Sequence, residues 1–383
     1  FGVFAALASE RGAPKVRAAA LWAALAVLVR ADGFVWVAMS GVAALATANT
    51  NERRAMFRAL VLVALVSLGV TLAYLAFRWS YFEALQPNTA RIKVAFGAKY
   101  LQRGAQYVAS LCLCVVSVPL ALGGALTRAR RDVSGLALGS LVFCASAFAY
   151  LILLGGDWMM MYRMLVPAMP FVALALGAWL ATLASPTLRL VLGGGVVVLG
   201  ALPCFDVHAV PRGGRELAHF RWSQDFRGEY EMWAKGVVDI ENWQLDGRAL
   251  GLATKPGESI VLGNIGALGY YAPELVVYDT QGLTNREPLL PLDPKAREMP
   301  GHDRKVEIAG FEKYRPTFFN ARIVSASEPW KILPKAWQAL DEQGASQGPN
   351  EAIRAKYDFE LVPLDEARGF RPDSALLLIR FRR

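Results

Sequence analysis

Long runs of apolar residues without charges dominate the first half of the chain and stop near Phe205. A helix that crosses a bilayer needs about 20 predominantly apolar residues in succession. The runs that predict such helices, each bounded by a charged or polar turn, are Ala59–Phe77, Gly104–Leu126, Val133–Leu154, Met164–Leu183 and Leu190–Pro203. The pattern therefore predicts an all-α helical bundle in a membrane.

Two further apolar runs, Ala18–Val29 and Phe34–Ala48, are short for a bilayer and are split by the charged sequence Arg30-Ala31-Asp32-Gly33. A charged, glycine-containing break at membrane depth persists only where it lines protein or water. We therefore expect two short helices that meet at a cleft in the membrane plane.

The remainder of the chain has the mixed composition of a water-exposed domain. Short β-branched and aromatic runs predict strands, and polar helix-compatible pieces such as Glu229–Val238 and Lys335–Glu342 lie before or between them. The predicted strands are Ser259–Leu262, Leu275–Asp279, Ala321–Ser325, Phe359–Val362 and Ala375–Phe381. This order favours a small α/β domain, so we predict a membrane domain over residues 1–204 and an α/β domain over residues 205–383.

The charges of the turns predict which side each turn faces. The turns at 9–17, 49–58, 127–132 and 184–189 are mostly rich in Arg and poor in acid, which is typical of cytoplasmic loops. The alternate turns at 30–33, 78–103 and 155–163 then face outward, as does everything after Phe205. The loop 78–103 holds several bases of its own, but long loops count for less in this rule. We expect a multi-pass protein of a bacterial cytoplasmic membrane with an extracytoplasmic C-terminal domain.

Composition narrows the classes of partner. The chain is 55% hydrophobic and 19% charged, and its net charge of +9 is typical of residues that set topology and contact anionic lipid. A nucleic-acid partner would need a basic face with interleaved aromatic residues, and none is visible. The four cysteines lie in or beside apolar runs, and the three histidines are scattered, so neither a disulfide framework nor a metal-ligand spacing is present.

The outward turns collect the candidate functional residues. Gly155–Pro170, which reads GGDWMMMYRMLVPAMP, places an acid and a base between two apolar runs. Ionisable groups at this depth are functional candidates, although aromatic anchoring and an Arg that snorkels to lipid headgroups would give the same pattern. The residues concerned are Arg30 and Asp32 in the first turn, Arg78, Trp79, Tyr81, Glu83, Asn88, Arg91 and Lys93 in the second, and Asp157, Trp158 and Arg163 in the third.

These residue types suit a phosphorylated, sugar-bearing lipid. Arg binds phosphate bidentately, carboxylates accept a proton from a hydroxyl or hold sugar hydroxyls, and Trp and Tyr offer flat apolar faces. We expect the three outward turns to converge in one pocket. The glycine-rich run Gly263–Gly269 has G-x-x-G-x-x-G spacing and is followed closely by Pro273 and a strand, so a dinucleotide site is not predicted.

Four segments together resemble a known family. They are Val29–Gly33 (VRADG), Arg78–Lys93 (with RWSYF, LQPNT and Lys93), Gly155–Pro167 (with GGDWM, Arg163 and Pro167) and Gly266–Asn285 (with GALGYY, Asp279, Gly282, Leu283 and Asn285). In the same order they resemble motifs of the polytopic bacterial GT-C glycosyltransferases, the class that includes protein O-mannosyltransferase-like and arabinofuranosyltransferase-like enzymes. Asp32 stands where the family has Glu, Ala31 where it has Pro, and Glu83 where it often has Gly.

The resemblance implies an inverting enzyme that transfers a sugar from a polyprenyl-phosphate donor to a glycan, lipid or protein of the cell envelope at the outer face of the membrane. Asp157 would be the catalytic or donor-contacting carboxylate. Arg163, Lys93 and Arg78 would stabilise the departing phosphate, Trp79, Tyr81 and Trp158 would shape the sugar and lipid pocket, and Arg30, Asp32 and Asn88 would add polar contacts. A divalent metal is left open.

Other functions remain open at this point. A non-catalytic transporter or scaffold for lipid-linked glycans is one alternative, although only one pair of broken helices is present where a transporter should show matching halves. An oligosaccharide polymerase or ligase would share the donor chemistry. The chain begins at Phe1 without Met, so we expect missing N-terminal helices and, by the resemblance, a catalytic Asp in an outward loop upstream of Phe1.

Overall fold

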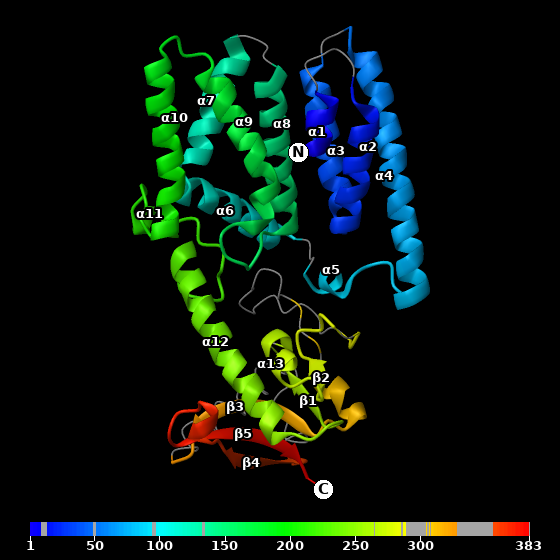
Figure 1. Cartoon of the computed structure of the whole chain (residues 1–383), viewed down its shortest axis with the longest axis vertical. Helices are drawn as coiled ribbons and strands as arrows, with labels where there is room; N and C mark the ends of the chain where they lie inside the picture. The colour runs from blue at the N-terminus through cyan, green and yellow to red at the C-terminus, as the bar shows by residue number, and fades with distance from the viewer. Residues whose placement is uncertain are drawn as a thin grey trace. The chain divides into compact units, whose positions relative to one another are not determined.

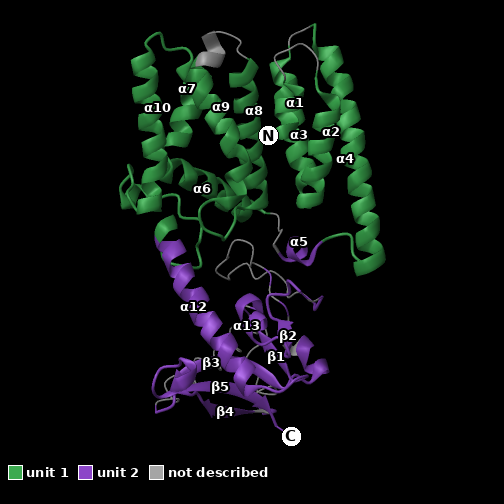
Figure 2. Cartoon of the chain, in the orientation of Figure 1, with its two compact units in different colours: residues 1–86, 95–230 green, residues 87–94, 231–383 purple. Residues whose placement is uncertain are grey.

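The computed structural model describes residues 1–8, 14–48, 51–93, 97–131, 135–263, 265–284, 286–288, 304, 306, 308–327 and 355–382. These residues form two compact units, each described by itself: residues 1–86 with 95–230, and residues 87–94 with 231–383 (Figure 2). The predicted helix at Lys335–Glu342, Asn285 and the side chain of Lys93 lie outside the described residues.

The first unit is helical (Figure 1). Within the described residues, four segments are long and apolar enough to cross a membrane, namely Arg53–Phe82, Gly135–Leu154, Arg163–Leu180 and Pro186–Phe205. Its elements are α1 (Gly2–Leu7), α2 (Val16–Val29), α3 (Gly33–Thr47), α4 (Arg53–Phe82), α6 (Ala98–Cys114), α7 (Ser117–Arg131), α8 (Gly135–Leu154), η1 (Arg163–Ala168), α9 (Met169–Leu180), α10 (Pro186–Ala201), η2 (Leu202–Phe205) and α11 (Arg212–Glu216). The predicted pattern of several apolar helices, with two short ones before them, is confirmed.

One predicted span is wrong in form. Gly104–Leu126 is not a single helix: α6 and α7 meet at a 92° bend, and α6 lies across the other helices of the bundle while α7 runs along them (Figure 1). Pro119 explains the break, because its ring would clash with the carbonyl of Val115, four residues earlier, in a continuous helix. Accordingly, α6 ends at Cys114, and Val115 is its C-cap residue.

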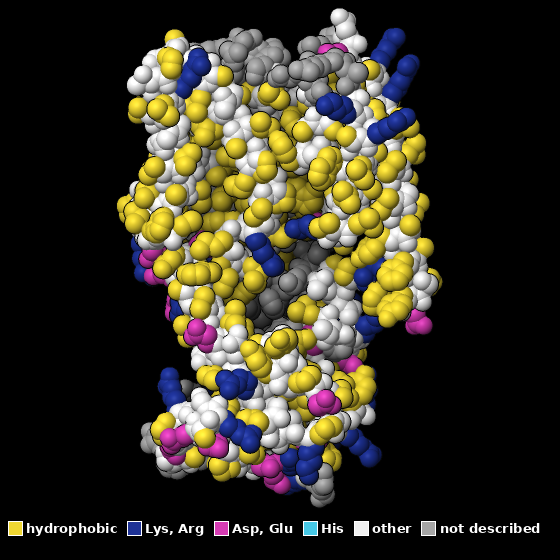
Figure 3. Space-filling view, viewed as in Figure 1, with side chains coloured by type: hydrophobic (Ala, Val, Ile, Leu, Met, Phe, Trp, Pro, Cys, Tyr) yellow, Lys and Arg dark blue, Asp and Glu magenta, His cyan; other side chains and the backbone are white. Residues whose placement is uncertain are grey.

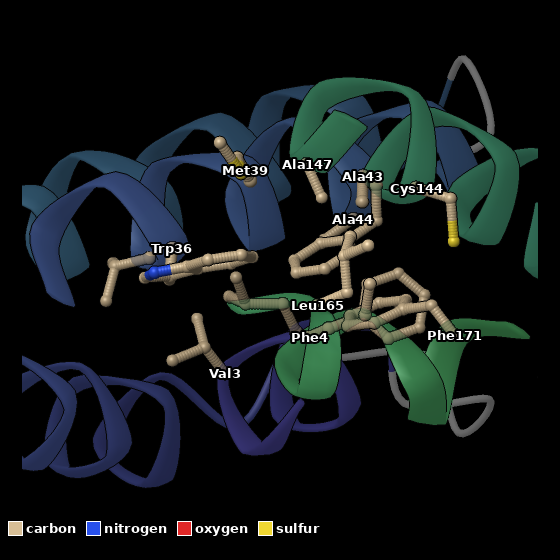
Figure 4. Close-up of a cluster of buried hydrophobic side chains, with 14 of the residues drawn as sticks. Val3, Phe4, Trp36, Met39, Ala43, Ala44, Cys144, Ala147, Leu165 and Phe171 are labelled. Atoms are coloured by element: carbon tan, nitrogen blue, oxygen red, sulfur yellow. The ribbon is translucent and has the colours of Figure 1, made fainter. Parts of the chain in front are cut away.

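Small residues allow the helices around α8 to approach closely. Ala43 and Ala44 of α3 and Ala147 of α8 are fully buried, and a side chain on Gly139 would lie 3.0 Å from the carbonyl oxygen of Ala43. Beside them, Phe171 of α9 stacks on Phe143 at 3.6 Å between ring centroids. The same cluster includes side chains from α1 and η1 (Figure 4). This packing holds the 155–163 turn between two fixed elements, α8 before it and η1 after it.

The second unit contains a mixed sheet with the strand order β2-β1-β3-β5-β4 in its described part. β1 is parallel to β2 and β3, whereas β5 is antiparallel to β3 and β4. Each predicted strand is present within three residues of its expected bounds. The elements are α5 (Asn88–Lys93), α12 (Glu229–Ala253), β1 (Ser259–Leu262), α13 (Ile265–Tyr271), β2 (Val276–Asp279), η3 (Ile308–Tyr314), β3 (Phe318–Ser325), β4 (Tyr357–Pro363), η5 (Glu366–Arg368) and β5 (Ser374–Phe381).

Helices cover the sheet on both faces. Leu250 of α12 and Leu268 of α13 pack on one face, and Phe311 of η3 packs on the other. Part of the glycine-rich run lies in a helix, α13, which has only seven residues, Ile265–Tyr271. Gly251 of α12 lets it approach closely, because an added Cβ there would lie 2.5 Å from the carbonyl oxygen of Tyr271.

The segment 87–94, which precedes α6 in the sequence, belongs to the second unit. Ile92 of α5 is 1% exposed and packs beside Gly282 in the turn after β2. The buried carboxylate of Asp279 organises this turn by accepting the backbone N–H groups of Gln281 (2.8 Å), Leu283 (2.7 Å) and Thr284 (3.2 Å). Part of the predicted outward loop is therefore built into the core of the α/β unit.

The units divide between Tyr230 and Glu231, whereas the sequence placed the boundary at residue 205. Residues after α10 pack on α6 instead of joining the sheet: Phe220 contacts the Tyr107 ring edge-on at 5.0 Å, and the indole N–H of Trp222 donates to Gln106 at 3.0 Å. Composition changes at 205 because these residues are polar, but their contacts keep them in the first unit.

Candidate functional site

The turn between α8 and η1, residues 155–163, has an unusual backbone. Two pairs of consecutive residues have left-handed conformation there: Gly155 (φ +76°) with Gly156 (φ +80°), and Met161 (φ +59°) with Tyr162 (φ +47°). A non-glycine residue in this region costs about 1–2 kcal/mol, and such a conformation persists only where the surroundings determine it. The turn must therefore be held by strong contacts.

Buried charged side chains supply those contacts. Arg103 of α6 is 1% exposed and donates from Nε to the carbonyl oxygen of Gly155 at 3.0 Å. Arg221 donates from Nε to the carbonyl of Trp158 at 3.2 Å and from Nη2 to that of Met159 at 3.4 Å. These guanidinium groups fix the first half of the turn.

Glu229 fixes the second half. Its Oε2 accepts the backbone N–H of Met161 at 2.7 Å, and its Oε1 pairs with Nη1 of Arg221 at 2.7 Å. Both side chains of this ion pair are nearly inaccessible, at 4% and 7%. A buried pair that also holds backbone groups satisfies its own hydrogen bonds, which is what makes burial of two charges tolerable.

The turn presents an acid and a base as a pair. Arg163 donates from Nε to Oδ2 of Asp157 at 2.6 Å and from Nη2 to Oδ1 at 3.4 Å. The Asp157 side chain is 10% exposed, but that of Arg163 is 49% exposed. A guanidinium has five N–H donors, so the half-exposed Arg163 has more donors than the two that bind Asp157.

A second ion pair comes from the break between α2 and α3. Arg30 donates to both oxygens of Asp32, at 2.8 and 3.0 Å, and Oδ2 also accepts from the indole of Trp36 (3.1 Å) and the hydroxyl of Tyr150 (3.2 Å). Burial acts to raise the pKa of Asp32, but the Arg30 hydrogen bonds and charge, with those of Trp36 and Tyr150, outweigh it and lower that pKa.

The two ion pairs are neighbours. Nη2 of Arg30 lies 3.6 Å from the sulfur of Met164, the residue directly after Arg163. The field of Asp157 also reaches Arg30, where it adds to the larger effect of the Asp32 hydrogen bond and raises the pKa of that guanidinium. The structure thus brings together the turns 30–33 and 155–163, which are more than a hundred residues apart in sequence.

Behind the turn, α6 presents a buried polar face. Tyr162 packs edge-on against Tyr107 at 5.6 Å between centroids, and its hydroxyl shares a 2.8 Å hydrogen bond with Ser110. Tyr107 and Ser110 recur with Tyr100 and Arg103 at helical spacing on one side of α6, and all four are buried. The buried polar side of α6 therefore packs against the 155–163 turn and hydrogen-bonds to it.

Other predicted site residues lie elsewhere. Arg78, Trp79 and Tyr81 are at the end of α4, which packs against α2 and α3. Trp79 and Tyr81 are 61% and 71% exposed, and Arg78 stacks over Phe82 at 5.1 Å within the same helix. The described contacts therefore group these residues around the end of α4 and not around Asp157.

The remaining predicted residues divide between the units. Asn88 is half-buried on α5 of the second unit, and Lys93 is the last residue of that helix. Trp158 is half-buried in the 155–163 turn, where its carbonyl accepts from Arg221. In the part of the chain that the structure describes, no group of three or more His, Cys, Asp or Glu side chains is placed to hold a metal ion.

The second unit has a cavity of about 580 Å³ between the end of α12 and the α13–β2 connection. Its lining includes the charged residues Arg248, Arg368 and Glu274, the aromatic residue Tyr271 and the hydroxyl-bearing Thr254. Nη2 of Arg248 donates to the carbonyl of Arg368 at 3.1 Å. Charged and aromatic groups around a space of this size suit a polar ligand that carries a ring.

Comparison with known proteins adds one match. Residues 237–361 match the family model of a domain of unknown function, DUF8728. This range runs from α12 to β4 and covers most of the second unit, but it includes none of the four segments that are long and apolar enough to cross a membrane. No curated protein and no solved structure matches the chain.

Proposed function

We propose that the protein is an integral membrane glycosyltransferase that moves a sugar from a polyprenyl-phosphate donor to an acceptor of the cell envelope. The observation that carries this proposal is the contact of Arg30 with Met164, which sets the Arg30–Asp32 pair beside the Asp157–Arg163 pair. Two carboxylates and two guanidinium groups at one place match a substrate with a phosphate at one end and sugar hydroxyls at the other.

The reaction needs one proton transfer and one displacement. A carboxylate accepts the proton of an acceptor hydroxyl, the oxygen forms a bond to the anomeric carbon, and the bond from that carbon to the donor phosphate breaks. The electron pair leaves with polyprenyl phosphate, so the configuration at the anomeric carbon inverts. Arg163, which is half exposed and hydrogen-bonded to Asp157, would stabilise the negative charge of the leaving phosphate.

Rigid support of the turn favours this role. Arg103, Arg221 and Glu229 fix its backbone, and preorganised donors stabilise developing charge without having to reorganise during the reaction. We further propose that the second unit is extracytoplasmic and selects the acceptor. Its cavity beside Arg248, Glu274 and Tyr271 would hold a saccharide ring and its polar groups.

The test uses a variant that removes both charges of the pair. Arg163→Ala alone would leave a buried carboxylate unpaired, which destabilises by about 3–5 kcal/mol, so Asp157→Asn with Arg163→Gln is preferred. Cells that lack the gene are complemented with wild type, this double variant or Arg189→Ala, an exposed arginine of α10 whose Nε donates to the carbonyl of Leu183. Envelope glycans are then compared by mass spectrometry.

We expect one glycan change on loss of the gene, its reversal by wild type and by Arg189→Ala, and no reversal by the double variant at equal membrane abundance. Full reversal by the double variant would remove the pair from the site. A glycan that accumulates on its lipid carrier without any missing sugar would favour a transporter instead.

A further inference from the structure

The start of α4 carries a basic cavity that the proposed glycosyl transfer does not use. Arg53, Arg54 and Arg58, with Phe57 and with Leu45 of α3, line a space of about 320 Å³. In the part of the chain that the structure describes, none of the three guanidinium groups makes an ion pair. Each arginine is exposed, and the neighbouring acid, Glu52, leaves the cluster with a net positive charge.

An apolar stripe leads away from this cavity along α4. Phe57, Val61, Leu65, Leu68 and Leu72 follow one another at spacings of three and four residues and are 62%, 42%, 58%, 53% and 56% exposed. Residues at these spacings share one face of a helix. In Figure 3, Lys and Arg side chains gather where α4 begins, and hydrophobic side chains cover its length.

The dimensions of α4 place the two features at a membrane boundary. Its 30 residues make a helix of about 45 Å, whereas the hydrocarbon core of a bilayer is about 30 Å thick. Only 11% of the most apolar 18-residue stretch of α4 is buried inside the protein. A helix of this kind has lipid along its apolar face and headgroups at its charged end.

We propose that Arg53, Arg54 and Arg58 form a binding site for the headgroup of an anionic phospholipid, with the acyl chains along the stripe from Phe57 to Leu72. This open depression of about 320 Å³ is at the small end of ligand sites, and that volume suits a phosphate-bearing headgroup. Guanidinium groups bind phosphate bidentately, and Phe57 and Leu45 offer apolar contact where the headgroup joins the chains. Basic pockets at helix ends recognise anionic lipids by the same chemistry.

The test measures lipid retained by the whole purified chain. Wild type, the triple variant Arg53→Gln/Arg54→Gln/Arg58→Gln and a control variant Lys15→Gln/Arg17→Gln/Arg189→Gln are exchanged into micelles with phosphatidylglycerol or phosphatidylcholine. Native mass spectrometry then counts bound lipid. The control removes the same number of exposed charges from the starts of α2 and α10 in the first unit.

We expect wild type and the control to retain phosphatidylglycerol over phosphatidylcholine, and the triple variant to lose this preference by about tenfold or more. Because loss of three charges can alter membrane insertion, Phe57→Ala provides a second variant with every charge intact, and it should also weaken retention. Inorganic phosphate should not displace the lipid. Equal retention by the triple variant and the control, no loss in Phe57→Ala, or full displacement by phosphate would each overturn the proposal.

Discussion

Arg221 and Glu229 form a buried ion pair, with 2.7 Å between Nη1 and Oε1, and both partners also bind the backbone of the 155–163 turn. The pair therefore does more than neutralise two charges, because it holds residues whose own conformational preferences oppose the turn. Met161 and Tyr162 adopt positive φ angles that neither residue would adopt alone. The shape of the candidate site thus depends on buried residues outside the 155–163 turn.

The first prediction concerns this pair. Arg221→Gln leaves Glu229 buried without its partner, and loss of one partner of a buried pair lowers the free energy of unfolding by about 3–5 kcal/mol. The double variant Arg221→Met/Glu229→Leu should lose less overall, since no lone charge remains, while proteolysis within 155–163 should become faster because the backbone contacts are gone. Thermal unfolding and limited proteolysis in detergent measure the two effects. An Arg221→Gln variant as stable as wild type would refute the bracing role.

The second prediction concerns pH and Asp32. The pKa of Asp32 is lower in the folded protein than in the unfolded chain, so its contribution to stability is present above the unfolded pKa and is lost as pH falls through the folded pKa. Wild type should therefore lose stability on acidification from near pH 5 toward pH 3 more steeply than Asp32→Asn does. Unfolding midpoints of both proteins across this range test the difference, and parallel curves would contradict it.

The third prediction concerns Gly282 in the second unit. Its φ is +68°, and an added Cβ would lie 2.4 Å from Cγ2 of Val306 and 2.9 Å from Cδ1 of Ile92. Gly282→Ala should combine backbone strain with overpacking and destabilise by about 2–4 kcal/mol. Gly257→Ala is the matched control, because Gly257 also has a positive φ (+82°) but nothing lies within 4 Å of an added Cβ.

Chemical denaturation monitored by tryptophan fluorescence would compare the two variants, and Ile92→Ala combined with Gly282→Ala should recover part of the loss. If the two glycine variants were equally stable, α5 would not pack against the Asp279 turn as described. Such a result would also separate segment 87–94 from the second unit.

The sequence predicts well whatever depends on local pattern. Apolar runs locate the helices, and β-branched runs locate the strands of the sheet, because burial of one face or both imposes a composition. The charged break at Arg30–Asp32 is equally visible, since charges interrupt an apolar run. The bend between α6 and α7 is different: only Pro119 indicates it, and a proline near the start of a helix is compatible with either form.

The contacts that shape the site could not be predicted in the same way. Arg103 is at the edge of an apolar run and looks like the end of a loop, although the spacing of Tyr100, Arg103 and Tyr107 could have indicated a polar helix face. Arg221 and Glu229 carry no local pattern that indicates their role, because the backbone groups that they bind in the 155–163 turn lie more than 60 residues away in sequence. The same holds for α5, whose membership of the second unit follows from Ile92 packing beside Gly282.

Binding of bare polyprenyl monophosphate is the most direct test of the central claim, because this leaving group is common to every donor sugar. Wild-type protein in lipid nanodiscs should bind it, Arg189→Ala should bind equally well, and Asp157→Asn/Arg163→Gln should bind about tenfold more weakly or worse, since the charge-assisted contacts are lost. Equal binding by wild type and by the double variant, or no binding by wild type, would contradict the account of the 155–163 turn as a phosphate-binding site.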